Sequence, residues 1–213
     1  MDMRFDNVYF VSGTAYAGKS TLVKNLAKKY CGIGCEENYH NILLPGLDSR
    51  LFPNLTYTRD LDDWHDFVRR MPDAYEVWID GVSRECEILE LGMLEKLCRE
   101  GKKVFVDTNV SLETLKQVSD KHHVLIMLAD PDISVNRFFN RPDRDKQFLY
   151  RLLMEEDEPE RALENFRQCL ARINSPKRYA AFLNSGFPVI LRDESRTPDE
   201  TLALAERLLC LKE

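Results

Sequence analysis

The sequence VYFVSGTAYAGKST, from Val8 to Thr21, is the most informative stretch of the chain for predicting its fold. Its first four residues form an apolar run, which predicts a buried strand ending at Ser12 and Gly13. From Ser20 to Tyr30, apolar side chains recur at helical spacing and lysines occupy the other face, so we expect an amphipathic helix there. The sequence therefore predicts a strand, a loop that contains glycines and a helix in direct succession.

The loop matches the pattern Gly-x-x-x-x-Gly-Lys-Ser at every fixed position. Two glycines let the backbone curve around phosphate oxygens with its N–H groups pointing inward. The lysine supplies a cation to the β- and γ-phosphates, the serine hydroxyl is a magnesium ligand, and the start of the following helix attracts anions. We therefore expect ATP and Mg²⁺ as cofactors, bound by Gly13, Thr14, Ala15, Tyr16, Ala17, Gly18, Lys19, Ser20 and Thr21.

Four further apolar runs predict the remaining strands. They cover residues 32–36, 104–107, 124–128 and 189–191, and two glycines weaken the first of them. Uniformly apolar strands that alternate with helices predict an α/β fold with about five parallel strands and helices on both faces, in three layers. No repeat or linker divides residues 1–213, so we expect a single domain.

Helical patterns fill the intervals between these runs. We expect a helix at 61–70, punctuated by Pro72, and then a longer helical pattern that carries Ile88, Leu91, Leu94 and Leu97 and stops at Gly101. Further helices are expected at 112–120 and, in several pieces, at 133–181. The last helix has the clearest start, because Thr197-Pro198-Asp199-Glu200 combines a capping hydroxyl, a proline at the first helical position and a glutamate that closes a capping box.

Asp107 stands at the end of the apolar run 104–106. Parallel sheets present their ligands at the carboxyl ends of the strands, so this carboxylate is a candidate to hold magnesium together with Ser20. The alternative is a structural role, as the N-cap of the following helix or as a turn former with Thr108 and Asn109.

Composition narrows the range of partners. The 213 residues carry a formal net charge of −6, which argues against a dedicated binder of nucleic acid or of an anionic membrane. The first residues lack an apolar signal core and no apolar run is long enough to span a bilayer, so we expect a cytoplasmic protein that does not enter a membrane. The six cysteines are expected to be reduced thiols.

Several classes of nucleotide-binding protein lack their signatures here. The chain has no Asn-Lys-x-Asp motif of GTPases and no Leu-Ser-Gly-Gly signature of transport ATPases, and Thr108 follows Asp107 where ring-forming ATPases usually have Glu. The order of elements resembles that of the small-molecule phosphate-loop kinases, the group that holds nucleoside monophosphate kinases and shikimate kinase. This resemblance covers nearly the whole chain, and its one sharp motif is the loop at Gly13–Ser20.

The resemblance implies a three-layer P-loop NTPase fold with a helical lid, here at about residues 131–158. Lid arginines in that group neutralise the transferred phosphoryl group together with the loop lysine, which makes Lys19, Arg137, Arg141 and Arg144 the catalytic candidates. Their spacing of three and four residues would put at least the first two on one face if the segment is helical. The alternative is a solvated charged face, since Asp143, Asp145 and Lys146 are interspersed.

The same resemblance implies that acceptor contacts follow the second strand. Glu36 and Glu37 are candidates to bind or deprotonate an acceptor hydroxyl, and Arg50 and Arg84 are candidates to bind an anionic acceptor. A Glu-Glu pair is otherwise an ordinary solvated surface feature. The chain lacks the segments typical of adenylate kinase, shikimate kinase and deoxynucleoside kinases, so the acceptor is left unnamed.

The expected activity is transfer of the γ-phosphoryl group of Mg-ATP to a small-molecule acceptor, such as a nucleoside, a nucleotide or another metabolite. The alternative is a nucleotide-dependent switch or slow ATPase that acts on a protein partner. Nucleic acid is a disfavoured partner, and both a monomer and a homodimer are compatible with the sequence.

Overall fold

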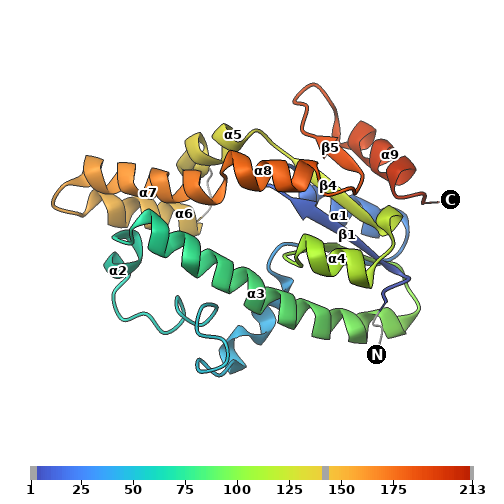
Figure 1. Ribbon diagram of the computed structural model, residues 1–213, viewed down its shortest axis with the longest axis horizontal. Coiled ribbons are helices and arrows are strands. Elements are labelled where there is room, and N and C mark those ends of the chain that lie inside the picture. The colour runs from blue at the N-terminus through green and yellow to red at the C-terminus, as the bar shows by residue number, and fades with distance from the viewer. Residues whose placement is uncertain (1–3, 141–143, 212–213) are drawn as a thin grey trace.

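A single parallel sheet organises the computed structural model, which describes residues 4–140 and 144–211 (Figure 1). The strands of these residues are β1 (Val8–Gly13), β2 (Ile33–Cys35), β3 (Val104–Asp107), β4 (Val124–Leu128) and β5 (Val189–Leu191). They lie in the order β2-β3-β1-β4-β5, and every neighbouring pair is parallel. The prediction of about five parallel strands is confirmed, including the glycine-weakened second one.

Alternate residues of each strand serve opposite faces of the sheet. Val8 and Phe10 pack in a cluster with side chains of α3 (Pro72–Leu97), α4 (Leu112–Val118) and α8 (Pro176–Leu183). Tyr9 and Val11 pack in a second cluster with α1 (Lys19–Lys29) and α9 (Pro198–Leu208). Because both faces of a parallel sheet are covered, its strands are apolar throughout. The expected coverage by helices on both faces is confirmed, and it is compatible with three layers.

Four helices lie between β4 and β5 in the part of the chain that the structure describes. They are α5 (Pro131–Asn136), α6 (Arg144–Met154), α7 (Pro159–Ile173) and α8, with the 3₁₀ turn η4 (Phe138–Asn140) after α5. Together with α2 (His65–Val68) and the start of α3, helices α5 to α7 surround a third apolar cluster centred on Phe166, Leu153 and Phe67. We call this unit the helical block; Figure 1 shows it beside the sheet rather than over either face.

The expected lid, residues 131–158, covers α5, η4 and α6. It is not an isolated flap, because α7 packs against both of its helices. Other short elements are the 3₁₀ helices η1 (Tyr39–Gly46), η2 (Cys98–Glu100) and η3 (Lys121–His123). The capping box at Thr197 and Glu200 is present at the start of α9.

Two helix predictions need correction. The expected helix at 61–70 is only the four residues of α2, because the turn buries Phe67 and Val68 in the helical block. The segment after Arg137 does not continue α5, because Arg137 caps that helix and a 3₁₀ turn follows. That turn lets the adjacent Phe138 and Phe139 both contact Phe166, with ring centroids 5.9 and 5.8 Å away.

The cysteines and the helix lengths complete the description. All six cysteines are free thiols; Cys35, Cys86 and Cys169 are buried, whereas Cys31 and Cys210 are exposed. No helix of the described residues has both the length and the apolar character needed to cross a bilayer.

Candidate functional site

The carboxyl ends of β1 and β4 lie next to each other at a topological switch point. From β1 the chain crosses to β2 on one side of the sheet, and from β4 it crosses to β5 on the other side. Open parallel sheets bind ligands in the crevice that such divergent connections leave. The loop Gly13–Ser20 follows β1 directly and therefore occupies this crevice.

The backbone of the loop takes conformations that its glycines make accessible. Gly13 and Gly18 have φ angles of 128° and 91°, and Tyr16 has a positive φ of 64°. A Cβ atom at Gly13 would overlap the carbonyl oxygen of Met127 in β4. Close packing of the two strand ends thus requires glycine at position 13.

Thr14 fastens the loop to the end of β4. Its amide donates to the Met127 carbonyl at 3.0 Å, and its hydroxyl oxygen accepts from the Ala129 amide at 2.7 Å. On the other side, Arg192 after β5 donates to the Tyr16 carbonyl. These contacts with the ends of β4 and β5 hold the loop in a fixed conformation.

Lys19, Ser20 and Asp107 meet beneath the loop. Ser20 Oγ donates to Asp107 Oδ2 at 2.8 Å, and Lys19 Nζ lies 3.7 Å from Asp107 Oδ1 while it donates to the Thr14 carbonyl at 3.1 Å. The Asp107 side chain is 3% exposed. Burial raises the pKa of its carboxyl above the ordinary value, and the Lys19 charge and the Ser20 hydrogen bond oppose this rise.

Oxygen donors of this kind suit a magnesium ion. A hydroxyl and one carboxylate, side by side, form a partial ligand set of the type that Mg²⁺ completes with water and phosphate oxygens. No group of three or more His, Cys, Asp and Glu side chains gathers as metal ligands within residues 4–140 and 144–211. The described residues therefore fit a metal that arrives with a phosphorylated ligand better than a metal held by protein alone.

Three cavities surround the loop. The β5-side cavity, about 580 Å³, is bounded by the loop, α1 and the segment after β5, and its lining includes Tyr16, Gly18, Asn25, Arg192, Arg196 and Thr201. The central cavity, about 390 Å³, separates the loop from the helical block, and its lining includes Lys19, Ser20, Glu37, Phe138, Lys146 and Asn174. The α3-side cavity, about 350 Å³, is lined by Gly13, Asp80, Arg84, Asn109 and Arg178 among others.

Neither of the two predicted lid arginines that the structure describes, Arg137 and Arg144, lines the central cavity. Arg137 is 52% exposed and its Nη1 atom pairs with Glu194 Oε1 at 3.1 Å, while its carbonyl accepts from the Tyr16 hydroxyl at 3.2 Å. Arg144 is exposed at the start of α6. Arg141 lies outside the described residues. The lid cation that faces the loop is instead Lys146, whose ammonium lies 5.6 Å from the Tyr16 ring centroid.

The acceptor candidates fall in different places. Glu37 lines the central cavity, whereas Glu36 points to the surface, 3.6 Å from Lys24. Arg84 lines the α3-side cavity. Arg50 is 88% exposed, pairs with its neighbour Asp48 and lines none of the three cavities around the loop.

A buried polar network behind Asp107 is a feature that sequence reasoning missed. Glu90 of α3 is fully buried and accepts from the Thr108 hydroxyl at 2.7 Å and from the Asn109 side-chain amide at 2.9 Å. His40 lies between Glu90 and Cys86, with Nδ1 3.3 Å from Glu90 Oε1 and Nε2 3.2 Å from Cys86 Sγ. Glu90 thereby fixes the turn that directly follows Asp107.

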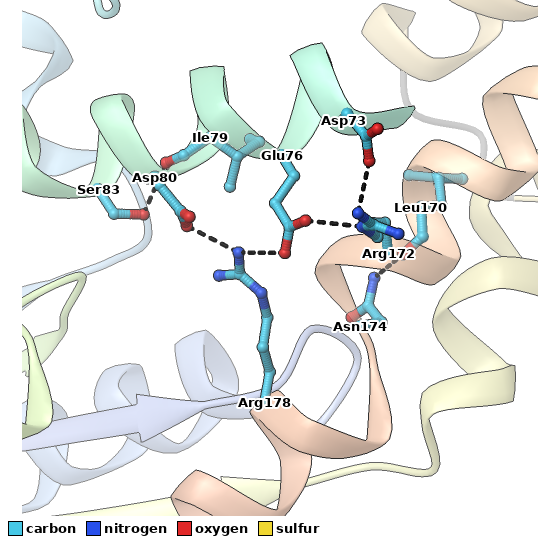
Figure 2. Close-up of polar contacts among 9 residues, drawn as sticks. All are labelled: Asp73, Glu76, Ile79, Asp80, Ser83, Leu170, Arg172, Asn174 and Arg178. Carbon is cyan, nitrogen blue, oxygen red and sulfur yellow. Dashed lines mark hydrogen bonds and ion pairs between the residues drawn. The ribbon is translucent and has the colours of Figure 1, made fainter. Parts of the chain in front are cut away.

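The same helix carries acids that bind arginines from α7 and α8, as Figure 2 shows. Arg178 donates to Glu76 Oε1 at 3.0 Å and to Asp80 Oδ1 at 2.8 Å, and Arg172 pairs with Glu76 and Asp73. These acids and Glu90 recur along α3 at helical spacing and face the sheet or the block. That periodicity of carboxylates was the one signal in the sequence that could have identified them.

Comparison with models of known protein families gives no match for this chain, and a search of curated protein sequences gives none. Function must therefore be inferred from the arrangement of the side chains.

Proposed function

We propose that the protein is a phosphotransferase that binds Mg-ATP at the Gly13–Ser20 loop and transfers the γ-phosphoryl group to a small-molecule acceptor. The observation that carries this proposal is the convergence of Lys19 and Ser20 on the buried carboxylate of Asp107, at the switch point of a parallel sheet. A cation, a hydroxyl and a carboxylate beneath a tightly curved loop are the groups that a metal-bound triphosphate needs.

The three cavities suggest how the nucleotide would lie. Its phosphates would follow the loop into the central cavity, where Lys19 and Lys146 provide positive charge. The base and ribose would occupy the larger β5-side cavity, whose lining mixes Leu22 and Ile190 with the polar Asn25 and Thr201. The first turn of α1 contains no acidic residue, so the helix itself adds no negative charge beside a bound anion.

Magnesium fits at Ser20 and Asp107, which would hold it directly or through water. When bound, the ion supplies positive charge to the β- and γ-phosphates. The protein's own contribution is positional: the loop amides and Lys19 orient the phosphates, and Lys146 lines the central cavity on the lid side. Arg137 would join them by exchanging Glu194 for a phosphate oxygen. Phosphates held between the loop and the helical block would be shielded from bulk water.

The decisive test is calorimetric titration with Mg-ATP of the wild type, Lys19→Ala and Lys28→Ala. Lys28 is an exposed lysine on the same helix, so its variant is a matched control. We expect Lys19→Ala to weaken binding by roughly 10- to 100-fold, the worth of a charge-assisted phosphate contact. Lys28→Ala should bind like the wild type. Equal binding by all three proteins would contradict the proposed site.

Turnover distinguishes the proposed transferase from a switch. A coupled assay of ADP release with nucleosides, nucleotides, sugars, shikimate and aminoglycosides should find an acceptor that raises the rate. If Mg-ATP binds and no compound raises the rate above a slow background, a nucleotide-dependent switch that acts on a protein partner becomes the better explanation.

A further inference from the structure

The α3-side cavity is the feature whose chemistry goes furthest beyond the proposed function. It adjoins Gly13 at the start of the loop and Thr108 and Asn109 after β3, so it opens at the same sheet edge as the central cavity. Its volume of about 350 Å³ is at the lower end of the range for small-molecule sites. That size suits a sugar or a nucleoside.

The charges on the cavity wall cancel. Arg84 and Arg178 are its cations, and Asp80 and Glu87 are its anions. Arg178 is already paired with Asp80 and with Glu76 behind it, so binding an anionic ligand would mean giving up those contacts (Figure 2). A phosphate group carries nearly two negative charges and is normally held by unpaired arginines. Of the four charged residues that line the cavity, Arg84 alone makes no ion pair or side-chain hydrogen bond with the described residues.

Beside the Arg84 guanidinium, the wall offers two oxygen acceptors that the described residues leave unengaged. Arg178 engages Oδ1 of Asp80, and Oδ2 accepts no hydrogen bond from the described residues. Glu90 can only accept, so the amide nitrogen of Asn109 points to it and the amide oxygen is left to face other groups. Carbonyl and carboxylate oxygens bind hydroxyl donors and repel phosphate oxygens, which are acceptors as well.

We propose that the α3-side cavity binds the acceptor, that the acceptor is a neutral hydroxyl-bearing molecule of sugar or nucleoside size, and that Asp80 takes the proton of its reacting hydroxyl. This inference rests on the proposed phosphotransfer. In the step, the hydroxyl oxygen forms a bond to the γ-phosphorus, and the bond from that phosphorus to the β–γ bridging oxygen breaks. ADP leaves with the electron pair, and the hydroxyl proton passes to Asp80. Arg178 acts as a positioning residue that orients the Asp80 carboxylate.

The test compares matched acceptors in the ADP-release assay. One set holds nucleosides and sugars, and the other holds the corresponding nucleoside monophosphates and sugar phosphates. We expect a member of the neutral set to raise the rate and its phosphorylated counterpart not to. Stimulation by the phosphorylated set, or by neither set in a protein that binds Mg-ATP, would overturn the inference. Failure to bind Mg-ATP would overturn the proposed function as well.

Two pairs of variants locate the acceptor in the cavity. Asp80→Asn should lower the stimulated rate by about 100-fold, the usual worth of a general base, with an unchanged Kd for Mg-ATP. Asp73→Asn, in the same arginine network but outside the cavity, should leave the rate unchanged. Ala181→Trp, on the cavity wall, should raise the KM for the acceptor, and Ala180→Trp, at an equally exposed neighbour that does not line the cavity, should not. A stimulated rate that survives both Asp80→Asn and Ala181→Trp would refute the assignment.

Discussion

The carboxyl edge of the sheet and the helical block face each other across the central cavity, yet they hold their polar groups by different means. At the sheet edge, Asp107 is 3% exposed and its partners come from a loop that is pinned to two neighbouring strands. In the block, aromatic rings supply the packing, and a charged group such as Arg137 pairs with Glu194 where both are more than half exposed.

This difference indicates which half of the site already has its final geometry before a ligand binds. Buried contacts at the sheet edge cost a great deal to rearrange, whereas an exposed ion pair contributes only about 0–1 kcal/mol. We infer that the loop and Asp107 keep their geometry when a ligand arrives, and that Arg137 exchanges its partner readily. Four experiments test this contrast, in order of decreasing expected effect.

The largest effect is expected at Gly13. In Gly13→Val the new side chain would overlap the Met127 carbonyl and would need a φ angle of 128°, so we expect a loss of more than about 3 kcal/mol in unfolding free energy. Gly92→Ala is the control, because a Cβ there meets nothing within 4 Å on an exposed turn of α3; it should stabilise by about 0.5–1 kcal/mol. Urea unfolding measures both, and a Gly13→Val protein of normal stability would contradict the preset loop.

Phe166→Ala should loosen the block and spare the sheet. Its ring contacts Phe67, Tyr75 and both phenylalanines of η4, so truncation should cost about 3–5 kcal/mol. Hydrogen exchange should then become faster in α2, α6 and α7 before it does in β1, β3 and β4. Leu183→Ala, at a side chain that is 45% exposed, should cost far less. Uniform acceleration over the whole chain would mean that the two regions unfold as one.

Asp107 and Glu156 should contribute to the free energy of unfolding with pH dependences of opposite sign. Burial raises the pKa of Asp107, so its contribution to stability is full below pH 3.8 and is lost as the pH rises through the folded pKa. The hydrogen bonds from Arg69 and His65 lower the pKa of Glu156 in the block, so its contribution is full above pH 4.5 and is lost as the pH falls through the folded pKa.

Urea unfolding of Asp107→Asn and Glu156→Gln between pH 3 and pH 7 checks this pair. Relative to wild type, Asp107→Asn should gain stability as the pH rises, and Glu156→Gln should lose it. Slopes of the same sign would show that the two carboxylates have similar environments.

The smallest change in stability is expected for Arg137→Ala, under about 1 kcal/mol, because its ion pair is exposed. Its effect on stimulated turnover should nevertheless be about 100-fold, with little change in the Kd for Mg-ATP. Arg161→Ala, which breaks a similarly exposed pair on α7, is the control for both readouts. Unchanged turnover in Arg137→Ala would remove this side chain from the proposed reaction.

The sequence predicted the sheet edge much better than the block. A run such as Val104–Val106 followed by Asp107 needs no distant information, because the uniformly apolar character that predicts a buried strand lies in neighbouring residues. The strand, the loop and α1 likewise follow from one continuous stretch. The contact between Ser20 and Asp107, 87 positions apart, was expected because the carboxyl ends of parallel strands meet at one edge.

The block depended on packing that no local pattern specifies. Phe138 and Phe139 read as part of a charged helix, yet both contact Phe166 from a 3₁₀ turn that directly follows Arg137. Lys146 was mentioned only as part of the alternative, a solvated charged face, although it lines the central cavity. Glu90 is a different case, since its spacing from Asp80 and Glu87 on α3 was visible and only its burial was not.

The buried thiols make it possible to measure, by chemical modification, how readily the sheet side and the helical block each open. Cys35 lies on the sheet side and Cys169 in the block, and burial raises the pKa of each to about 11. Very little thiolate is present at neutral pH, so alkylation of either sulfur has to wait for its surroundings to open. Cys31 and Cys210 are exposed and serve as an internal standard in the same reaction. Alkylation with a single reagent, followed by peptide mass spectrometry, therefore measures the opening rates of the sheet side and of the helical block separately. The native cysteines serve as the labels, so no engineered label is needed.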